Sequence, residues 1–388
     1  MQYRRHGGIE LSEVGVGCYG LSGAYGPKDP GAYRRMLQRA CELGVNLFDT
    51  ADAYGPAEEV LGQAIAPYRD RVYVATKVGA RAGPAPGSLG RQAVRRACEQ
   101  SLRRLQTDRI DLYQVHFDDP QTPIAETVAA LEELVREGKV RHYGVGHLPL
   151  ERVAEYLAEG HVFSVLMELS AVARQALGVL LPLCRQRGVG AIAFSVTGRG
   201  LLTGRYAGGH RFEAGDIRNL DPLFQRERCQ SGLRVAGMLA EVGRRCGRTP
   251  AQVAIAWVLA QPGVVSALVG PSTVPHLEED LGGSGWQLSA GELAEIDAFL
   301  AREDAWLAEA QRGSVRRILS EPLPAEPARA LTDLVYALET AVALGLASEE
   351  AAMPLFRELY PIWKAPEPGD RPVLEDIQRR LAGLIGKE

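Results

Sequence analysis

The first 300 or so residues alternate between short apolar runs rich in β-branched residues and longer segments with a helical spacing of apolar residues. This rhythm is typical of repeated strand–helix units around a parallel sheet. Eight candidate strands can be counted, at residues 14–18, 45–49, 72–77, 111–116, 141–146, 163–168, 190–195 and 265–269. Because eight such units close into a barrel, the sequence predicts the α/β class with a (β/α)8 TIM barrel.

The segments between the strands predict helices and two unusual connections. Candidate helices lie at residues 31–43, 89–105, 124–137, 150–158, 177–187 and 250–259. Thr249 and Pro250 are a strong helix start, as N-cap and first helical residue. Residues 2–10, centred on Gly7 and Gly8, predict a hairpin that plugs the barrel floor. Residues 205–228 are long and lack periodicity, which is typical of a functional loop.

After about residue 304 the rhythm stops and the chain becomes helical. Three helices are predicted at residues 328–344, 349–359 and 373–385, with a linker at 364–372. We therefore expect two domains, a barrel over residues 1–304 and a helical C-terminal extension over residues 305–388. The apolar faces of the extension predict docking, either onto the barrel or onto a second copy of the chain in a homo-oligomer.

Composition narrows the classes of function. A formal net charge of -4 and a pI near 6.1 do not supply the positive field that a nucleic-acid partner needs. The six cysteines are scattered without the spacing of metal ligands, which predicts a reduced, cytoplasmic protein with no metal site. No apolar run is long enough for a membrane span, so we expect no membrane partner. Because the charge balance also argues against nucleic acid, the expected partner is a small molecule.

Ionisable side chains follow three consecutive predicted strands. Asp49 and Tyr54 follow the second strand, Lys77 ends the third, and His116 ends the fourth. In a barrel these strand ends meet at one rim, where catalytic groups lie. A single lysine or histidine there would more often be structural, but four converging groups favour a catalytic site.

These residue types suit the transfer of hydride and a proton. Reduction of a carbonyl group requires a neutral acid near the forming alkoxide, and Tyr54 fits that role. We expect Lys77 to lower the phenol pKa toward the working range and Asp49 to hold Lys77 charged. His116 would hydrogen-bond the substrate oxygen and orient the carbonyl, or share in the proton transfer.

At this point the chain resembles the aldo-keto reductases from about residue 1 to 300. The resemblance rests on the segments Asp-Thr-Ala-Asp-Ala-Tyr-Gly (49–55), Ala-Thr-Lys-Val (75–78), Ile-Asp-Leu-Tyr-Gln-Val-His (110–116), Gly-Leu-Leu-Thr-Gly-Arg-Tyr (200–206) and Ala-Gln-Val-Ala-Ile-Ala-Trp-Val-Leu (251–259). It implies a barrel that binds a nicotinamide dinucleotide without a Rossmann domain. It also implies a catalytic tetrad of Tyr54, Lys77, His116 and Asp49.

The resemblance and the residues at the predicted strand ends together predict a set of cofactor contacts and a substrate pocket. The cofactor contacts are Gly17, Cys18, Tyr19, Asp49, His147, Phe194, Ser195, Gly198, Gly200, Gly270, Ser272, His276, Glu279 and Asp280. The pocket candidates are Tyr19, Tyr25, Phe117 and His147.

Two parts of the cofactor site depart from the family pattern. The Ser-Asn and Gln that grip the nicotinamide carboxamide are replaced by Gly146-His147 and by Leu166 or Met167. A basic residue for a 2'-phosphate is replaced by Ser272 or His276. The family implies NADPH as the cofactor. Because the basic residue is replaced, NADH stays open.

The leading hypothesis is an NAD(P)H-dependent oxidoreductase acting on a carbonyl or alcohol substrate, such as a sugar or a secondary-metabolite ketone or aldehyde. A second hypothesis is a non-redox lyase or isomerase on the same barrel, because the carboxamide grip is altered. A third is a cofactor-sensing subunit of a larger assembly that docks through the C-terminal helices.

Overall fold

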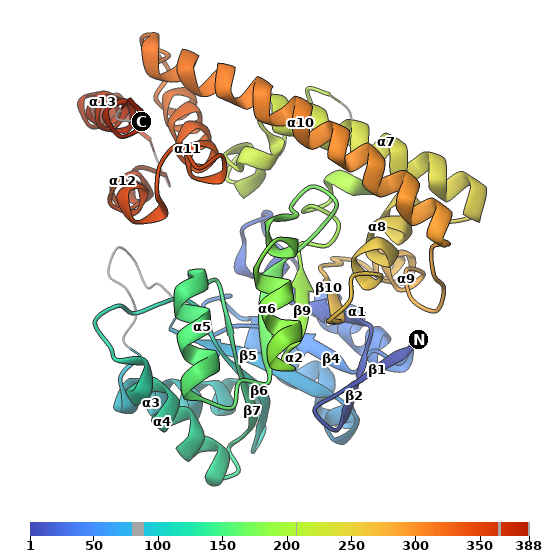
Figure 1. Ribbon diagram of the computed structural model, residues 1–388. Coiled ribbons are helices and arrows are strands. Elements are labelled where there is room, and N and C mark those ends of the chain that lie inside the picture. Colours follow the sequence, from blue (N-terminus) through green and yellow to red (C-terminus); the bar gives the residue numbers. More distant parts are fainter. Residues whose placement is uncertain (80–88, 207, 364–365, 387–388) are drawn as a thin grey trace. The chain divides into compact units, whose positions relative to one another are not determined.

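The computed structural model describes residues 1–79, 89–206, 208–363 and 366–386 (Figure 1). The chain forms two compact units. The first consists of Met1–Arg205 and Ala236–Ala294, and the second of Tyr206–Val235 and Glu295–Glu388. The second unit thus combines the C-terminal helices with a segment that follows the seventh predicted barrel strand.

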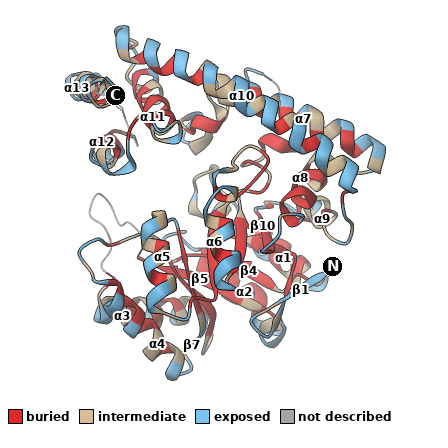
Figure 2. Cartoon of the chain, in the orientation of Figure 1, coloured by how far each residue is buried: buried red, intermediate tan, exposed pale blue. Residues whose placement is uncertain are grey.

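Eight parallel strands form a closed barrel in the first unit. In sequence they are β3 (Val14–Gly17), β4 (Leu47–Asp49), β5 (Tyr73–Val78), β6 (Ile110–Val115), β7 (Val140–Gly146), β8 (Ser164–Glu168), β9 (Gly190–Phe194) and β10 (Val264–Val269), and β10 pairs with both β3 and β9 to close the ring. Every predicted strand overlaps an observed one, so the predicted barrel is confirmed. The strands are buried almost throughout, as expected where helices cover the outer face of a parallel sheet (Figure 2).

Helices connect the strands. They are α1 (Pro30–Glu42), α2 (Ala57–Ile65), α3 (Arg91–Leu105), α4 (Ile124–Arg136), α5 (Leu150–Glu159), α6 (Leu180–Arg187), α8 (Pro250–Leu259) and α9 (Val274–Leu281), with the 3-10 helices η1 (Tyr19–Ser22), η2 (Ala66–Arg71), η3 (Gln175–Leu177) and η4 (Leu201–Thr203). Helices α1, α3, α4, α5, α6 and α8 overlap the predicted helices, whereas α2 and α9 were not predicted. Helix α8 begins where predicted, because Thr249 and Gln252 form a capping box.

The N-terminal hairpin lies against the starts of the barrel strands. It pairs β1 (Tyr3–His6) with β2 (Ile9–Ser12), and the turn places Gly7 and Gly8 at φ values of 53° and 83°. His6 Nε2 lies 2.9 Å from the carbonyl oxygen of Phe163, just before β8. Arg4 donates to the carbonyl oxygen of Val264 at 2.8 Å. The hairpin therefore covers the N-terminal end of the barrel, as predicted.

The second unit has an apolar core of its own. Its helices are the first part of α7 (Arg226–Cys246), most of α10 (Ala290–Ser320), α11 (Pro327–Ala343), α12 (Glu349–Trp363) and α13 (Arg371–Ile385), with η5 (Ile217–Asn219), η6 (Pro222–Phe224) and η7 (Pro368–Asp370). Leu331, Leu334, Leu355, Ile377 and Leu381 are among its fully buried side chains. The helices of this unit thus bury apolar faces against one another.

Several boundaries differ from the sequence expectations. Helix α10 continues through residue 304 without a break, because its apolar positions persist on both sides of that residue. Residues 205–228 contain two 3-10 helices and the start of α7, so the expected loop is partly ordered. The expected linker 364–372 already contains η7 and the start of α13, while residues 364–365 lie outside the described part. Among the described helices, none combines the length and the apolar character that a membrane span needs.

Candidate active site

The four predicted catalytic residues come from the C-terminal ends of neighbouring strands. Asp49 is the last residue of β4, and Lys77 is the next-to-last residue of β5. His116 directly follows β6, and Tyr54 lies between β4 and α2. Because parallel strands end at the same rim of a barrel, the fold brings these residues together.

A buried ion pair forms the base of this group. Lys77 Nζ lies 2.5 Å from Asp49 Oδ1 and donates to the carbonyl oxygen of Thr50 at 2.6 Å. The other carboxylate oxygen, Asp49 Oδ2, accepts from Gln114 Nε2 at 3.0 Å. Lys77 is 1% exposed and Asp49 6% exposed, so water contributes little to holding either charge in place.

The ionisation of this pair follows from burial and mutual attraction. Burial raises the pKa of Asp49, while Lys77 and Gln114 oppose the rise by stabilising the carboxylate. Burial also disfavours the Lys77 ammonium, but the attraction of the Asp49 carboxylate, followed by smaller contributions, outweighs it and the pKa of Lys77 is raised. Lys77 therefore carries its charge at neutral pH.

Tyr54 lies beside this cation, although its acidity differs from the expectation. Lys77 Nζ is 4.9 Å from the centre of the Tyr54 ring. Burial raises the pKa of Tyr54 to about 12, and Lys77 only partly offsets this effect. The expectation that Lys77 brings this pKa down toward the working range was wrong, because the loss of hydration outweighs the nearby charge. Tyr54 is consequently a protonated phenol over the physiological range.

His116 is a neutral group at the same rim. Its ring centre is 5.7 Å from that of Tyr54, and the residue is 4% exposed. Burial, together with Lys77 and His147, lowers the pKa of His116 to about 2. Its Nδ1 atom is buried and has no hydrogen-bond partner among the described residues. A neutral imidazole can donate one hydrogen bond, which is what a carbonyl oxygen accepts.

Aromatic rings extend from the tetrad in two directions. On one side Tyr19 lies 5.0 Å from Tyr54 and 5.6 Å from Tyr25, measured between ring centres. On the other side the His116 ring stacks on Phe117 at 4.4 Å and lies 5.4 Å from His147. The structure thus brings all four predicted pocket residues to Tyr54 or His116, directly or through one intervening ring.

The strand ends next to His147 have an unusual backbone. His147, Ser195 and Arg199 adopt φ values of 51°, 60° and 53°, a region that disfavours residues with a side chain. The His147 ring lies 4.8 Å from Phe194, the residue before Ser195. Ser195 Oγ is buried without a partner among the described residues. Strained backbone and an unsatisfied hydroxyl are both typical of a ligand site.

The predicted adenosine end gathers around helix α9. Thr273 caps this helix, and Ser272 and Gly270 precede it after β10. Burial and Glu279 raise the pKa of Asp280 to about 7, against the opposing charge of Arg205. Burial and Arg205 lower the pKa of His276, so this ring is neutral at physiological pH. His276 therefore supplies no cation for a 2'-phosphate there.

The remaining predicted contacts lie at the end of β3 and after β9. Gly17 is the last residue of β3, and Cys18 follows it with its backbone N–H bonded to the carbonyl oxygen of Asp49 at 2.8 Å. The Cys18 side chain is fully buried, and burial places its thiol pKa far above the usual range, so it is no nucleophile. Gly198 and Gly200 both have positive φ in the turn before η4.

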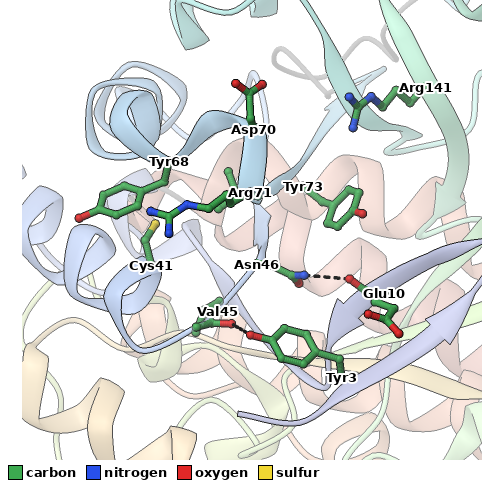
Figure 3. Close-up of a pocket in the computed structure, with 12 residues that line it drawn as sticks. Tyr3, Glu10, Cys41, Val45, Asn46, Tyr68, Asp70, Arg71, Tyr73 and Arg141 are labelled. Atoms are coloured by element: carbon green, nitrogen blue, oxygen red, sulfur yellow. Dashed lines mark hydrogen bonds between the residues drawn. The ribbon is translucent and has the colours of Figure 1, made fainter.

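A hollow of about 400 Å³ lies at the other end of the barrel (Figure 3). It is lined by residues at the starts of strands, including Asn46 before β4, Tyr73 in β5 and Arg141 in β7, and by Tyr3 of the hairpin. Asp49 and Lys77 lie at the opposite ends of these strands. The hollow is therefore separate from the tetrad.

Two residues near these sites were not anticipated from the sequence. The amide of Gln114 donates to Asp49. Its position could have indicated this role, because Gln114 is a polar residue in an apolar strand, two positions before His116 and on the same face. Arg205 forms an ion pair with Glu279, one of the predicted adenosine contacts. That pairing joins residues distant in sequence, so no local pattern could have identified it.

Comparison with known proteins identifies similarity over about the first 300 residues. Residues 13–301 match the sequence model of the Aldo/keto reductase family. The chain is 33% identical over 301 residues to aldo-keto reductase YhdN of Bacillus subtilis, covering 76% of this chain and 91% of that protein.

Solved structures show the same fold. The glycerol dehydrogenase AKR11B4 of Gluconobacter oxydans superposes with a TM-score of 0.71 at 29% identity, covering 78% of this chain and 96% of that one. An aldo/keto reductase of Klebsiella pneumoniae, crystallised with NADP and acetate, superposes with a TM-score of 0.61 at 30% identity, covering 77% and 95%. Residues beyond 301 lie outside the family match.

Proposed function

The chain belongs to the aldo/keto reductase family, and we propose on that basis that it moves hydride between NADPH and a small polar carbonyl compound or its alcohol, with Tyr54 as the general acid and base. The observation that carries the proposal is the group formed by the buried Asp49–Lys77 pair, the protonated Tyr54 phenol and the neutral His116 ring. Lys77 is thus a cation, Tyr54 a proton donor and His116 a hydrogen-bond donor, all at one rim of the barrel.

The residues perform distinct steps in this scheme. His116 donates a hydrogen bond to the carbonyl oxygen and orients it toward Tyr54. When bound, the nicotinamide supplies or accepts the hydride at the substrate carbon. As negative charge develops on the substrate oxygen, Tyr54 gives up its phenolic proton, and the O–H bond of the alcohol forms. The resulting phenolate lies beside the Lys77 ammonium, which stabilises it until a proton returns from solvent.

A nicotinamide dinucleotide fits the residues around the tetrad. The unpaired Ser195 hydroxyl offers a hydrogen bond, and Phe194 offers an apolar face next to His147. A side chain at Gly270 would meet no atom within 4 Å, so this strand end leaves open space. Asp280, whose pKa burial raises to about 7, can donate to an adenine edge when protonated and accept from it when ionised. These residues, with Glu279, would hold the cofactor in the proposed function.

The cofactor is NADPH, as in the relative crystallised with NADP. Ser272 and the neutral His276 are weaker phosphate ligands than the bidentate guanidinium of an arginine, so use of NADH as well agrees with the residues present. Arg205 lies beside Glu279 and is a cation at this end of the site.

The substrate is a small hydroxylated carbonyl compound such as a sugar. Tyr19, Tyr25 and His147 place hydroxyl and imidazole groups around an otherwise aromatic rim, a combination that suits a polar substrate with several hydroxyl groups. The similarity to a glycerol dehydrogenase supports the same class.

The test is turnover and cofactor binding by the purified full-length chain. Oxidation of NADPH would be followed by absorbance with glyceraldehyde, other small aldoses and aromatic aldehydes, and binding by quenching of protein fluorescence. We expect binding and turnover with NADPH and weaker binding with NADH. A protein that binds neither dinucleotide would refute the proposal, and conversion of a substrate without either one would support a lyase or isomerase.

A further inference from the structure

Gln114 lies in the barrel wall beside Lys77 and contacts Asp49. In the parallel ladder of β5 and β6, Gln114 is the direct partner of Lys77. Its Nε2 donates to Asp49 Oδ2 at 3.0 Å, while Asp49 Oδ1 holds Lys77. The residue is 1% exposed. Asp49 is thus held between a cation on one oxygen and an amide on the other.

The chemistry of the two groups determines which way this amide points. An ionised carboxylate only accepts hydrogen bonds, so the NH2 end of the amide must face Asp49. The other end, Oε1, is buried and has no partner among the described residues. A buried amide with an unpaired oxygen destabilises the fold, and an apolar side chain of equal length would avoid that loss. What Gln114 contributes is therefore the hydrogen bond to Asp49.

We propose that Gln114 is a positioning residue of the reaction, which keeps Asp49 ionised and directed at Lys77 and thereby sets the charge beside Tyr54. This inference rests on the proposed function. It assigns a role to a fifth side chain that touches neither substrate nor cofactor and acts only through Asp49.

The coupling has a defined direction. The Gln114 hydrogen bond favours the charged form of Asp49, and that charge raises the pKa of Lys77. Without the hydrogen bond, the proton of Lys77 is shared more readily with Asp49, and the ammonium is lost at lower pH. Tyr54 then lacks the cation that stabilises its phenolate, and proton transfer slows.

The first test replaces Gln114 with methionine, which has a similar length and no amide. With NADPH and glyceraldehyde we expect kcat at neutral pH to fall about tenfold, the equivalent of one hydrogen bond to a charged group. The KM for glyceraldehyde should stay within about twofold, because the side chain does not touch substrate. The alkaline limb of the kcat profile should move to lower pH by about one unit.

A second variant separates electrostatics from packing. Gln114→Glu keeps the shape, and its carboxyl group keeps a proton beside Asp49, because two buried carboxylates in hydrogen-bond contact do not both ionise. The protonated acid donates the hydrogen bond that the amide donated, so the alkaline limb should stay near its wild-type position while that of Gln114→Met moves to lower pH. A packing role would give the two variants the same profile.

The matched control is Ser266→Ala. Ser266 is a fully buried polar residue of β10 that donates to the carbonyl oxygen of Ser12 at 2.9 Å, far from the tetrad along the chain and near the strand start. It should lower the melting temperature without changing the pH profile. An unchanged alkaline limb in a folded Gln114→Met would overturn the inference. If that variant does not fold, an unchanged alkaline limb in a folded Gln114→Leu would overturn it. Failure of the wild type to bind either dinucleotide would instead refute the proposed function.

Discussion

The two units use the same kinds of side chain in different ways. In the first unit, Tyr54, Lys77 and Asp49 converge at one rim, where His116 Nδ1 and Ser195 Oγ remain without partners among the described residues. In the second unit, Tyr336 donates to Glu227 Oε2 at 2.9 Å, and Glu227 Oε1 accepts from Ser314. There a tyrosine and a carboxylate tie three helices together.

The difference separates chemical from structural roles. A polar group whose bonds all go to neighbouring helices stabilises the fold and has nothing left for a ligand. A rim with a neutral phenol, a neutral imidazole and an unpaired hydroxyl keeps hydrogen-bonding capacity for one. The comparison therefore predicts that equivalent substitutions in the two units affect different measurements.

The largest effect is expected from Tyr54→Phe. Removing the phenolic proton donor should lower kcat by about 10²–10⁴-fold, the usual contribution of general acid catalysis. Binding of NADPH, measured by fluorescence quenching, should change little because the ring remains. A variant that keeps more than half of the wild-type kcat would remove Tyr54 from the proposed mechanism.

Its matched control is Tyr336→Phe in the second unit. The Tyr336 side chain is fully buried, and loss of its hydrogen bond to Glu227 should lower the free energy of unfolding by about 2 kcal/mol. The kcat of the folded protein should equal that of the wild type. A large fall in kcat at unchanged stability would show that the second unit takes part in catalysis.

An intermediate effect is expected in the pH dependence of stability. The pKa of His116 falls from 6.5 to about 2 on folding, so the unfolded chain takes up this proton first as pH decreases. The contribution of His116 to the free energy of unfolding is fully present above the pKa of the unfolded histidine. It decreases as the pH falls below that value, by about 2 kcal/mol at about pH 5. Denaturant unfolding of wild type and His116→Gln would measure this. Equal slopes of stability against pH below neutrality would contradict the assignment of a buried, neutral His116.

The smallest effect is expected from Arg380→Ala on the surface of the second unit. Arg380 lies 2.7 Å from Glu358, and each side chain is 41% exposed. Exposed ion pairs contribute less than about 1 kcal/mol. Urea unfolding should therefore give nearly the wild-type free energy, with kcat unchanged. A loss comparable to that of Tyr336→Phe would mean that surface charge, rather than buried contacts, holds this unit together.

Much of the barrel could be predicted because its signals are local. The apolar runs that became β3 to β10 and the Thr249-Pro250 helix start depend on residues within a few positions of each other. The tetrad was predictable for the same reason, since Asp49, Lys77 and His116 each end an apolar strand. The resemblance to the family then added the cofactor.

Other features depend on contacts between distant residues. The second unit combines residues 206–235 with the C-terminal helices. Ion pairs such as Arg226–Asp333 join these segments across 107 positions, and no local pattern in the sequence indicates them. The division at residue 304 stays a prediction. The docking of the extension, a second copy of the chain and the cytoplasmic location likewise stay predictions.

The sequence by itself determined that eight strands alternate with helices and that ionisable groups end three of them, because side-chain periodicity is a property of the local chain. Only the tertiary structure decided the acidity of those groups. Burial raises the pKa of Tyr54 to about 12 and lowers that of His116 to about 2. The fold also brings the Gln114 amide within hydrogen-bond distance of the Asp49 carboxylate. The hydration and the hydrogen-bond partners of a group depend on which residues of the whole chain surround it. The spacing of residues along the sequence does not show which residues those are.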